Sequence, residues 1–161
     1  MPDSSDAIVV GLISDTHGLL RASVHEALEG VSLILHAGDV GGPEILDELR
    51  MIAPVHAVYG NTDDPGDPEL AQEIVMPLGG IDVHVSHGHE LGSPSPEKLL
   101  SSYPQQVIVY GHTHRQMINR ADGRLVVNPG AAGPKRFNLS PSVARLTVTG
   151  NKAEVEIVAI D

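Results

Sequence analysis

Five short motifs along the chain supply seven candidate metal ligands, none of them a cysteine: Asp15, His17, Asp39, Asn61, His87, His112 and His114. The motifs are Asp15-Thr16-His17, Gly38-Asp39, Gly60-Asn61, His87-Gly88-His89 and Gly111-His112-Thr113-His114. Carboxylate and amide oxygens, together with imidazole nitrogens, suit divalent manganese, iron, zinc, cobalt or nickel. A set of this size is enough for two ions, and paired ions of this kind are typical of hydrolytic enzymes.

Each motif follows an apolar segment that is typical of a buried strand. Residues 7–13 (AIVVGLI) end at the first motif, residues 31–35 end near Gly38, and residues 55–59 end at Gly60. Segments with helical spacing of apolar residues, from Leu20 to Leu28 and from Pro43 onward, separate these strands. This alternation predicts a parallel sheet. Ligands gather at the carboxyl ends of such strands, where these motifs lie.

Each motif on its own also has a structural explanation. Asp15 could cap a helix, and Asp39 and Asn61 each follow a glycine as turn residues often do. A single histidine is more often structural, whereas His112 and His114, two residues apart after a buried strand, favour a metal. Five coincidences at strand ends are improbable, so we interpret the motifs as one site with two metals.

The remaining histidines are weaker candidates. His25 falls on the first predicted helix and is expected at the surface, and His56 and His84 fall within strands, where a structural role is expected. His36 and His89 lie close to the motifs in the sequence. They are equally open to orienting the ligands and to an ordinary structural role.

The second half of the chain changes from alternating helices and strands to hairpins. Strands are predicted at residues 73–76, 81–86 and 107–110, with a short helix at 96–102. Hairpins follow at 117–120 with 124–127 and at 144–148 with 153–160, because Ala121-Asp122-Gly123 and Thr149-Gly150-Asn151 are turn sequences. We therefore expect one α/β domain over residues 1–161, built from two packed sheets with helices outside.

Composition restricts the classes of partner. The chain has 161 residues, 10 basic and 21 acidic, a formal net charge of −11, and only three tyrosines and one phenylalanine as aromatics. This balance argues against a nucleic-acid or anionic-membrane surface. With no cysteine, disulfides and thiolate metal sites are excluded. Residues 1–6 do not resemble a signal peptide, and no apolar segment is long enough to span a bilayer, so we expect a cytoplasmic protein.

The five motifs, in this order, resemble those of the calcineurin-like metallophosphoesterases. The similarity is narrower to the small single-domain bacterial and archaeal phosphodiesterases, whose fold the retromer subunit Vps29 shares. Asn128-Pro129-Gly130-Ala131 also resembles that branch. The resemblance covers residues 8–133 and implies a four-layer α-β-β-α sandwich.

The resemblance also implies a role for each ligand. Asp15, His17 and His114 would hold one metal, Asn61, His87 and His112 the other, and Asp39 would bridge them. The implied activity is that of a phosphodiesterase in which a hydroxide bridges two divalent ions, with manganese favoured. Asp39, Asn61 and His112 would act through positioning of the metals and the phosphate. Two carboxylates against two divalent ions leave the site with a charge of about +2, which suits a small phosphodiester or monoester anion.

One position departs from the larger relatives, which carry a histidine after the Gly-Asn motif as the expected proton donor. Here Thr62 occupies that position and Asp63 follows. Asp63 or a nearby histidine could protonate the leaving group, or the enzyme could favour leaving groups that need no proton. Residues 63–67 and 133–138, the latter with Lys135 and Arg136, could shape specificity or be ordinary surface loops. The natural substrate and a homo-oligomeric state are left open.

The competing interpretation is a protein-interaction scaffold of the same fold, with a structural or vestigial metal site. A scaffold has no need of all seven ligands, and all seven are present. We therefore favour the enzyme.

Overall fold

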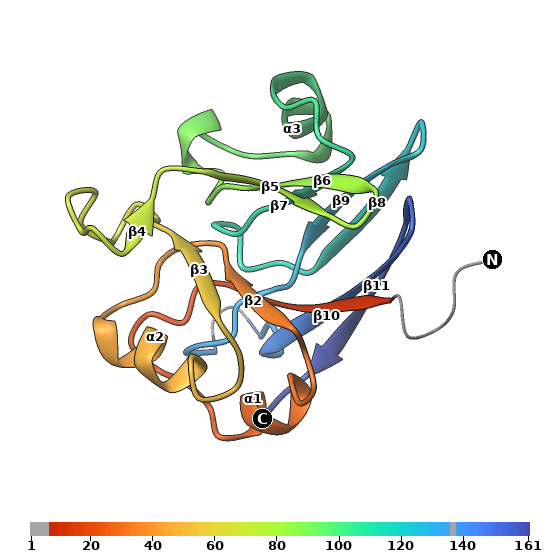
Figure 1. Ribbon diagram of the computed structural model, residues 1–161. Helices are drawn as coiled ribbons and strands as arrows, with labels where there is room; N and C mark the ends of the chain where they lie inside the picture. Colours follow the sequence, from red (N-terminus) through yellow and green to blue (C-terminus); the bar gives the residue numbers. More distant parts are fainter. Residues whose placement is uncertain (1–6, 136–137) are drawn as a thin grey trace.

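Two sheets pack face to face in the computed structural model, which describes residues 7–135 and 138–161 (Figure 1). The first sheet has the strand order β11-β10-β1-β2-β3-β4 and the second has the order β5-β6-β7-β9-β8. The strands of the first sheet are β1 (Ile8–Ile13), β2 (Leu33–His36), β3 (Val55–Val58), β4 (Leu70–Ala71), β10 (Ser142–Thr149) and β11 (Lys152–Ala159). Those of the second are β5 (Ile74–Leu78), β6 (Ile81–Val85), β7 (Val107–Val109), β8 (Met117–Ala121) and β9 (Arg124–Asn128).

Three short helices cover the outer faces of the sheets. Helices α1 (Ser23–Ala27) and α2 (Pro43–Leu49) lie beneath the first sheet in Figure 1, and α3 (Pro96–Ser102) lies above the second. One apolar cluster fills the space between the sheets, a second joins the first sheet to α1 and α2, and a third joins the second sheet to α3. The predicted α-β-β-α sandwich is confirmed.

Parallel pairing brings the carboxyl ends of the central strands to one edge of the sandwich. In the first sheet β1, β2 and β3 run parallel, with Ile13 opposite His36 and His36 opposite Ala57. In the second sheet β6, β7 and β9 run parallel, with Val85 opposite Val109. These strands are apolar on both faces because core lies on each side, which is why they read as continuous apolar segments.

Some details differ from the sequence-based expectations. Helix α1 begins at Ser23 and not at Leu20, and the side chain of Arg21 in the preceding loop donates to the Gly133 carbonyl. Strand β4 and a 3₁₀ turn at His89–Leu91 were not predicted, since two- and three-residue elements carry no periodicity. The hairpin β10–β11 returns to pair antiparallel with β1, which completes the first sheet.

In the described part of the chain, none of the helices has the length and apolar character needed to cross a membrane.

Arg124 on β9 is expected to stabilise the second sheet and α3. Its guanidinium donates to the carbonyls of Leu100 at 3.0 Å, Gln105 at 2.9 and 3.0 Å, and Tyr103. Arg124→Leu leaves these carbonyls without a charged donor, so we expect urea unfolding to reveal a loss of about 2–3 kcal/mol.

Arg120→Leu is the matched control for Arg124. Arg120 makes one exposed bond to the Ala153 carbonyl, and its loss should cost less than about 1 kcal/mol. Equal effects of the two substitutions would contradict the assigned role of Arg124.

Candidate metal centre

The loops that follow β1, β2, β6 and β7 are joined to one another by backbone hydrogen bonds. The amides of Asp15 and His17 donate to the carbonyls of Gly38 and Asp39, each at 2.9 Å. On the second sheet the amide of Gly111 donates to the carbonyl of His87, also at 2.9 Å. The motifs are thereby held in fixed relation at one edge of the sandwich.

Asp15 stands between three imidazole rings. Its Oδ1 atom lies 3.3 Å from Nε2 of His114, 3.8 Å from Nε2 of His17 and 3.9 Å from Nε2 of His87. Asp15 is fully buried and His114 nearly so. Asp15, His17 and His114 therefore form one group whose ligand atoms could hold a single ion.

A second group adjoins the first. Asp15, Asp39 and His87 could also hold an ion, with Oδ2 of Asp39 3.3 Å from Nε2 of His87 and 3.5 Å from Nε2 of His17. The amide oxygen of Asn61 lies 3.1 Å from Nε2 of His87 and 3.2 Å from Nδ1 of His112. All seven residues named from the sequence thus lie in one cluster, while their division between two ions stays a prediction.

The protonation of His87 indicates that its Nε2 is prepared for a cation. Its Nδ1 lies 2.7 Å from the Ala37 carbonyl, which only accepts, so Nδ1 carries a proton. In the neutral ring Nε2 then presents a lone pair to the oxygens of Asn61 and Asp39, which are acceptors as well. These lone pairs repel one another unless an added proton or a cation lies between them.

Unpaired polar atoms gather at the same point. Oδ1 of Asp15 and Nε2 of His17 are buried and have no hydrogen-bond partner among the described residues, and Nδ1 of His114, whose Nε2 faces Asp15, is also unpaired there. Leaving buried polar groups unpaired is costly. A divalent cation would satisfy Asp15 and His17 directly, so the donor set fits a metal of the borderline class.

The pKa values of the two carboxyl groups in the cluster are lowered, as binding of a metal requires. Burial acts to raise the pKa of Asp15, but the imidazoles of His114, His17 and His87 outweigh burial and hold that pKa well below its usual range. Burial also opposes ionisation of Asp39, yet His87 and the Thr62 amide lower its pKa to about 2. Both carboxylates are therefore ionised at neutral pH.

The pKa values of His87 and His112, the two histidines beside Asn61, are shifted in opposite directions. Burial acts to lower the pKa of His87, but the carboxylates of Asp39 and Asp15 raise it on balance. Burial and the neighbouring His87 lower the pKa of His112. A cation bound at Nε2 of His87 would compete with protonation of that nitrogen.

Backbone strain concentrates at the ligand positions. In the described chain seven non-glycine residues have positive φ, and five of these are Asp15, His17, Asp39, His112 and His114. Asp and His tolerate this region better than most residues, but each still adopts it at a cost. Strain clustered on predicted ligands supports a functional site.

The glycines of the motifs permit close approach between loops. A Cβ atom at Gly111 would collide with Ser14 and lie 2.7 Å from Oδ2 of Asp15, and one at Gly38 would lie 2.6 Å from Nδ1 of His87. These two glycines are therefore needed for the geometry of the neighbouring ligands, which explains why a glycine precedes Asp39 and His112.

Several residues that position the ligands were not recognised as such in the sequence. The Ser14 hydroxyl donates to Oδ2 of Asp15 at 2.6 Å, and Asn128 donates to the Gly111 carbonyl and the Thr113 hydroxyl at 3.1 Å. Glu90 accepts from the Gly88 amide and the Tyr103 hydroxyl. Of these, only Asn128 carried a signal, as the first residue of Asn128-Pro129-Gly130-Ala131.

His36 lies inside this framework as a neutral ring. Its Nδ1 accepts from the Gly38 amide at 3.1 Å, and its Nε2 donates to the Thr16 hydroxyl at 3.0 Å, which in turn donates to the Val40 carbonyl at 2.7 Å. This chain of bonds joins the loop after β1 to the loop after β2. Of the two roles left open for His36, the contacts support positioning.

The other histidines lie away from the cluster, apart from His89. His25 contacts Glu48 at 3.3 Å on the helical face, His56 is exposed on β3, and His84 is buried and stacks on Tyr103 with ring centres 3.7 Å apart. The His89 ring centre lies 5.3 Å from that of His87. Its Nδ1 has no partner in the described residues.

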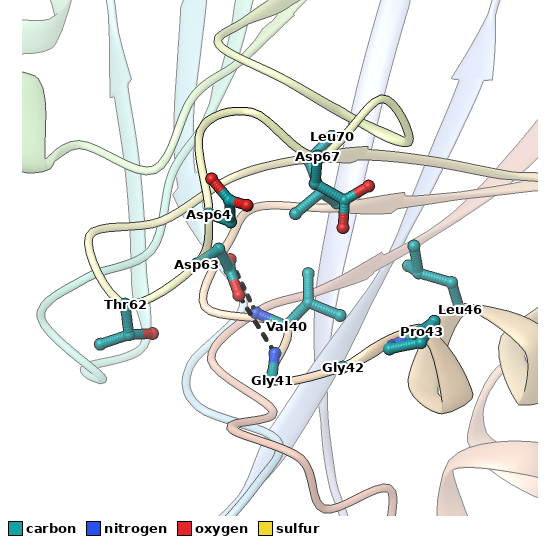
Figure 2. A pocket seen from close by; sticks show the side chains of 10 residues that line it. All are labelled: Val40, Gly41, Gly42, Pro43, Leu46, Thr62, Asp63, Asp64, Asp67 and Leu70. Atoms are coloured by element: carbon teal, nitrogen blue, oxygen red, sulfur yellow. Dashed lines mark hydrogen bonds between the residues drawn. The ribbon is translucent and has the colours of Figure 1, made fainter.

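Asp63 accepts three backbone hydrogen bonds with its carboxylate. Its Oδ2 accepts from the amides of Val40 at 3.0 Å and Gly60 at 2.9 Å, and its Oδ1 accepts from Gly41 at 3.1 Å. Figure 2 shows the bonds to Val40 and Gly41. Both carboxylate oxygens are thus engaged by backbone amides of the surrounding loops, so the contacts favour a positioning role over proton donation. Arg136, named from the sequence for specificity, lies outside the described residues.

Comparison with known proteins finds relatives over most of the chain. Residues 8–151 match the family model of the calcineurin-like phosphoesterase superfamily domain. A probable metallophosphoesterase of Methanothermobacter thermautotrophicus is 35% identical over 159 residues, which are 94% of this chain and 92% of that protein. A phosphodiesterase of Methanocaldococcus jannaschii is 27% identical over 139 residues, 75% of this chain and 82% of that protein. Vacuolar protein sorting 29 of Cryptosporidium parvum shares the fold, with a TM-score of 0.80 at 23% identity over 96% of this chain and 98% of that chain.

His36 should remain neutral well below pH 6.5. Burial lowers its pKa to about 4, with the carboxylates of Asp15 and Asp63 opposing the shift. Below pH 6.5 the unfolded chain binds a proton that the folded ring does not, so this contribution to stability is complete above about pH 6.5 and is lost as pH falls towards 4.

Nitrogen-15 NMR of the imidazole rings measures the His36 titration directly. The folded protein should retain a neutral ring with its proton on Nε2 from pH 7.5 to pH 5. Histidines of the urea-unfolded chain serve as the reference, with a midpoint of about 6.5. A His36 midpoint at that same value in the folded protein would contradict the assignment.

Proposed function

This chain belongs to the calcineurin-like phosphoesterase superfamily, and we propose that it is a phosphodiesterase that uses two divalent metal ions. The observation that carries the proposal is the cluster in which two ionised carboxylates and an amide oxygen face four imidazoles. A bound cation would satisfy Oδ1 of Asp15 and Nε2 of His17, the buried atoms of the cluster that face it without a hydrogen-bond partner among the described residues. A shared fold alone would not distinguish an enzyme from a scaffold.

The proposed ligands are those expected from the sequence. Asp15, His17 and His114 would hold one ion, and Asn61, His87 and His112 the other. Asp39 would bridge the two, a role consistent with its Oδ2 lying near both His17 and His87. When bound, the ions would supply Lewis acidity at the phosphoryl group and a hydroxide nucleophile at neutral pH.

The protein's own groups prepare the site for this chemistry. The Ala37 carbonyl fixes the His87 proton on Nδ1 and leaves Nε2 free to bind. The Thr62 amide donates to Oδ1 of Asp39 at 3.0 Å and leaves Oδ2 directed at the histidines. With two carboxylates against two divalent ions, the site is cationic and attracts an anionic phosphoester despite the net charge of −11.

The site offers no evident proton donor to the leaving alcohol among the described residues. Thr62 stands where larger relatives carry a histidine, and the Asp63 carboxylate is engaged by three amides. We therefore propose that the enzyme prefers diesters whose leaving group departs without protonation, among small phosphodiester substrates.

Metal-dependent hydrolysis tests the proposed function. Protein stripped with a chelator should not hydrolyse bis(p-nitrophenyl) phosphate, and added Mn²⁺ should restore turnover. Asp39→Ala removes the proposed bridge, so we expect it to lose both ions, measured by elemental analysis, and to retain less than about 1% of the rate. Full metal content and full rate in Asp39→Ala would contradict the ligand assignment.

The alternative function is a protein-interaction scaffold, which the structural similarity to vacuolar protein sorting 29 favours. Folded wild-type protein without turnover of any phosphoester, in the presence of Mn²⁺, Zn²⁺, Fe²⁺, Co²⁺ or Ni²⁺, would support the scaffold. The reason to prefer the enzyme is that all seven proposed ligands converge.

The role of Asp63 is tested with substrates that differ in leaving group. If Asp63 positions the loop, Asp63→Asn should lower both metal affinity and stability. Its amide nitrogen would replace one carboxylate oxygen and could not accept the backbone hydrogen bonds, from Gly41 or from Val40 and Gly60, that this oxygen accepts. If Asp63 donates the proton, the loss should be confined to kcat for diesters with poor leaving groups.

Thr62→His complements the test of Asp63. A histidine at this position should raise kcat for methyl diesters relative to p-nitrophenyl diesters by about tenfold or more. An unchanged ratio would mean that another group already supplies the proton.

A further inference from the structure

Two cavities border the metal centre, and their linings differ in charge. The first, of about 320 Å³, lies between α2 and the loop that follows β3 (Figure 2). Thr62 and Asp63 form one side of it, and Asp64 and Asp67 add further carboxylates. Thr62 also donates through its amide to Asp39, which connects this cavity to the proposed bridge.

The second cavity, of about 390 Å³, begins at the proposed ligand His114. Arg115 and Met117 line it on the side of β8, and Asn138, Leu139 and Ser140 line it on the opposite side. Beside His114, the lining combines a cation, two amides (Gln116 and Asn138), a hydroxyl and two apolar side chains, and no carboxylate lines it among the described residues. A proposed ligand lines the second cavity, the first is connected to the cluster through Thr62, and the two differ in the sign of their charged side chains.

Arg115 differs from the other described arginines in having no partner. Arg21, Arg120, Arg124 and Arg145 each donate to a backbone carbonyl, and Arg50 pairs with Asp47 and Glu69. Within residues 7–135 and 138–161, the Arg115 guanidinium makes neither an ion pair nor a hydrogen bond. The guanidinium is therefore available to a ligand in the cavity that it lines.

We propose that the cavity beside His114 is the subsite for one alcohol arm of the phosphodiester, and that Arg115 selects arms that carry an anionic group or carbonyl-type acceptors. The inference rests on the proposed function and names a specificity-determining residue for it. A guanidinium presents several donors in a fixed plane, which suits carboxylate, phosphate and paired carbonyl acceptors.

The opposite cavity supports the same orientation of the substrate. Carboxylates of Asp64 and Asp67 repel an anionic arm and leave room for a neutral or cationic one. An asymmetric diester would therefore bind with its acceptor-rich arm beside Arg115. The apolar side chains of Met117 and Leu139 would pack against the flat faces of such an arm.

The test compares two chromogenic diesters that share a leaving group and differ in the other arm. The p-nitrophenyl ester of thymidine 5′-phosphate carries a flat arm with carbonyl acceptors, and p-nitrophenylphosphorylcholine carries a cationic arm. With Mn²⁺-loaded wild-type protein, the thymidine diester should have the higher kcat/KM. Arg115→Met should lower the ratio of the two kcat/KM values by about tenfold, mainly through KM for the thymidine diester.

Arg115→Lys should recover part of the preference, since it keeps the charge but not the planar donors. Arg120→Met is the matched control, because Arg120 lies on β8 outside the cavity, and it should leave the ratio unchanged. Metal content is measured for every variant, so that loss of an ion at His114 is recognised.

Two outcomes would overturn the inference, and they are distinguishable. Turnover of both diesters by wild-type protein with the same ratio in Arg115→Met would refute the subsite while leaving the proposed function intact. Absence of turnover of both diesters and also of bis(p-nitrophenyl) phosphate by metal-loaded wild-type protein would refute the subsite and the proposed function together.

Discussion

The site depends on the buried carboxylate of Asp15, in which only one of the two oxygens accepts hydrogen bonds. Oδ2 of Asp15 accepts from the Ser14 hydroxyl and, across to the second sheet, from the His112 amide at 3.2 Å. Oδ1 is left without a hydrogen bond and faces three imidazoles. An ionised group in such a position is costly to bury unless opposite charge compensates it. Asp15 therefore joins the two sheets through its Oδ2 atom, while its unpaired Oδ1 atom favours a cation between them.

The two-sheet architecture explains how the proposed cation ligands, which are far apart in the chain, come together. Parallel strands in both sheets end at the same edge, and the loops that leave β1, β2, β3, β6 and β7 each carry one or two proposed ligands. Positive φ angles at five ligand residues and glycines at the points of closest approach let these loops meet without intervening side chains. The framework of His36, Thr16 and Asn128 holds the loops by hydrogen bonds. These contacts hold the proposed ligands in place, and ligands held in place lower the cost of binding an ion.

Much of this arrangement could be predicted from the sequence because the pattern is local. The apolar segments before Asp15, Gly38 and Gly60 identify parallel strands, and parallel strands determine where their loops gather. What could not be predicted depends on partners distant in the sequence. Helix α1 begins late where Arg21 bonds to Gly133, and β10 pairs with β1. The role of Asp63 depends on three amides that only the folded loops bring to it. Short polar residues carry no periodic signal, so their positioning roles emerge only from the fold.

The central claim is that the cluster holds two ions, with Asp39 between them. The most direct measurement is anomalous X-ray diffraction from crystals of the protein loaded with Mn²⁺, collected at the manganese absorption edge. The account predicts two anomalous peaks, one among Asp15, His17 and His114 and one among Asn61, His87 and His112, about 3.5–4 Å apart. A single peak, or none in the presence of ordered ligand side chains, would contradict it.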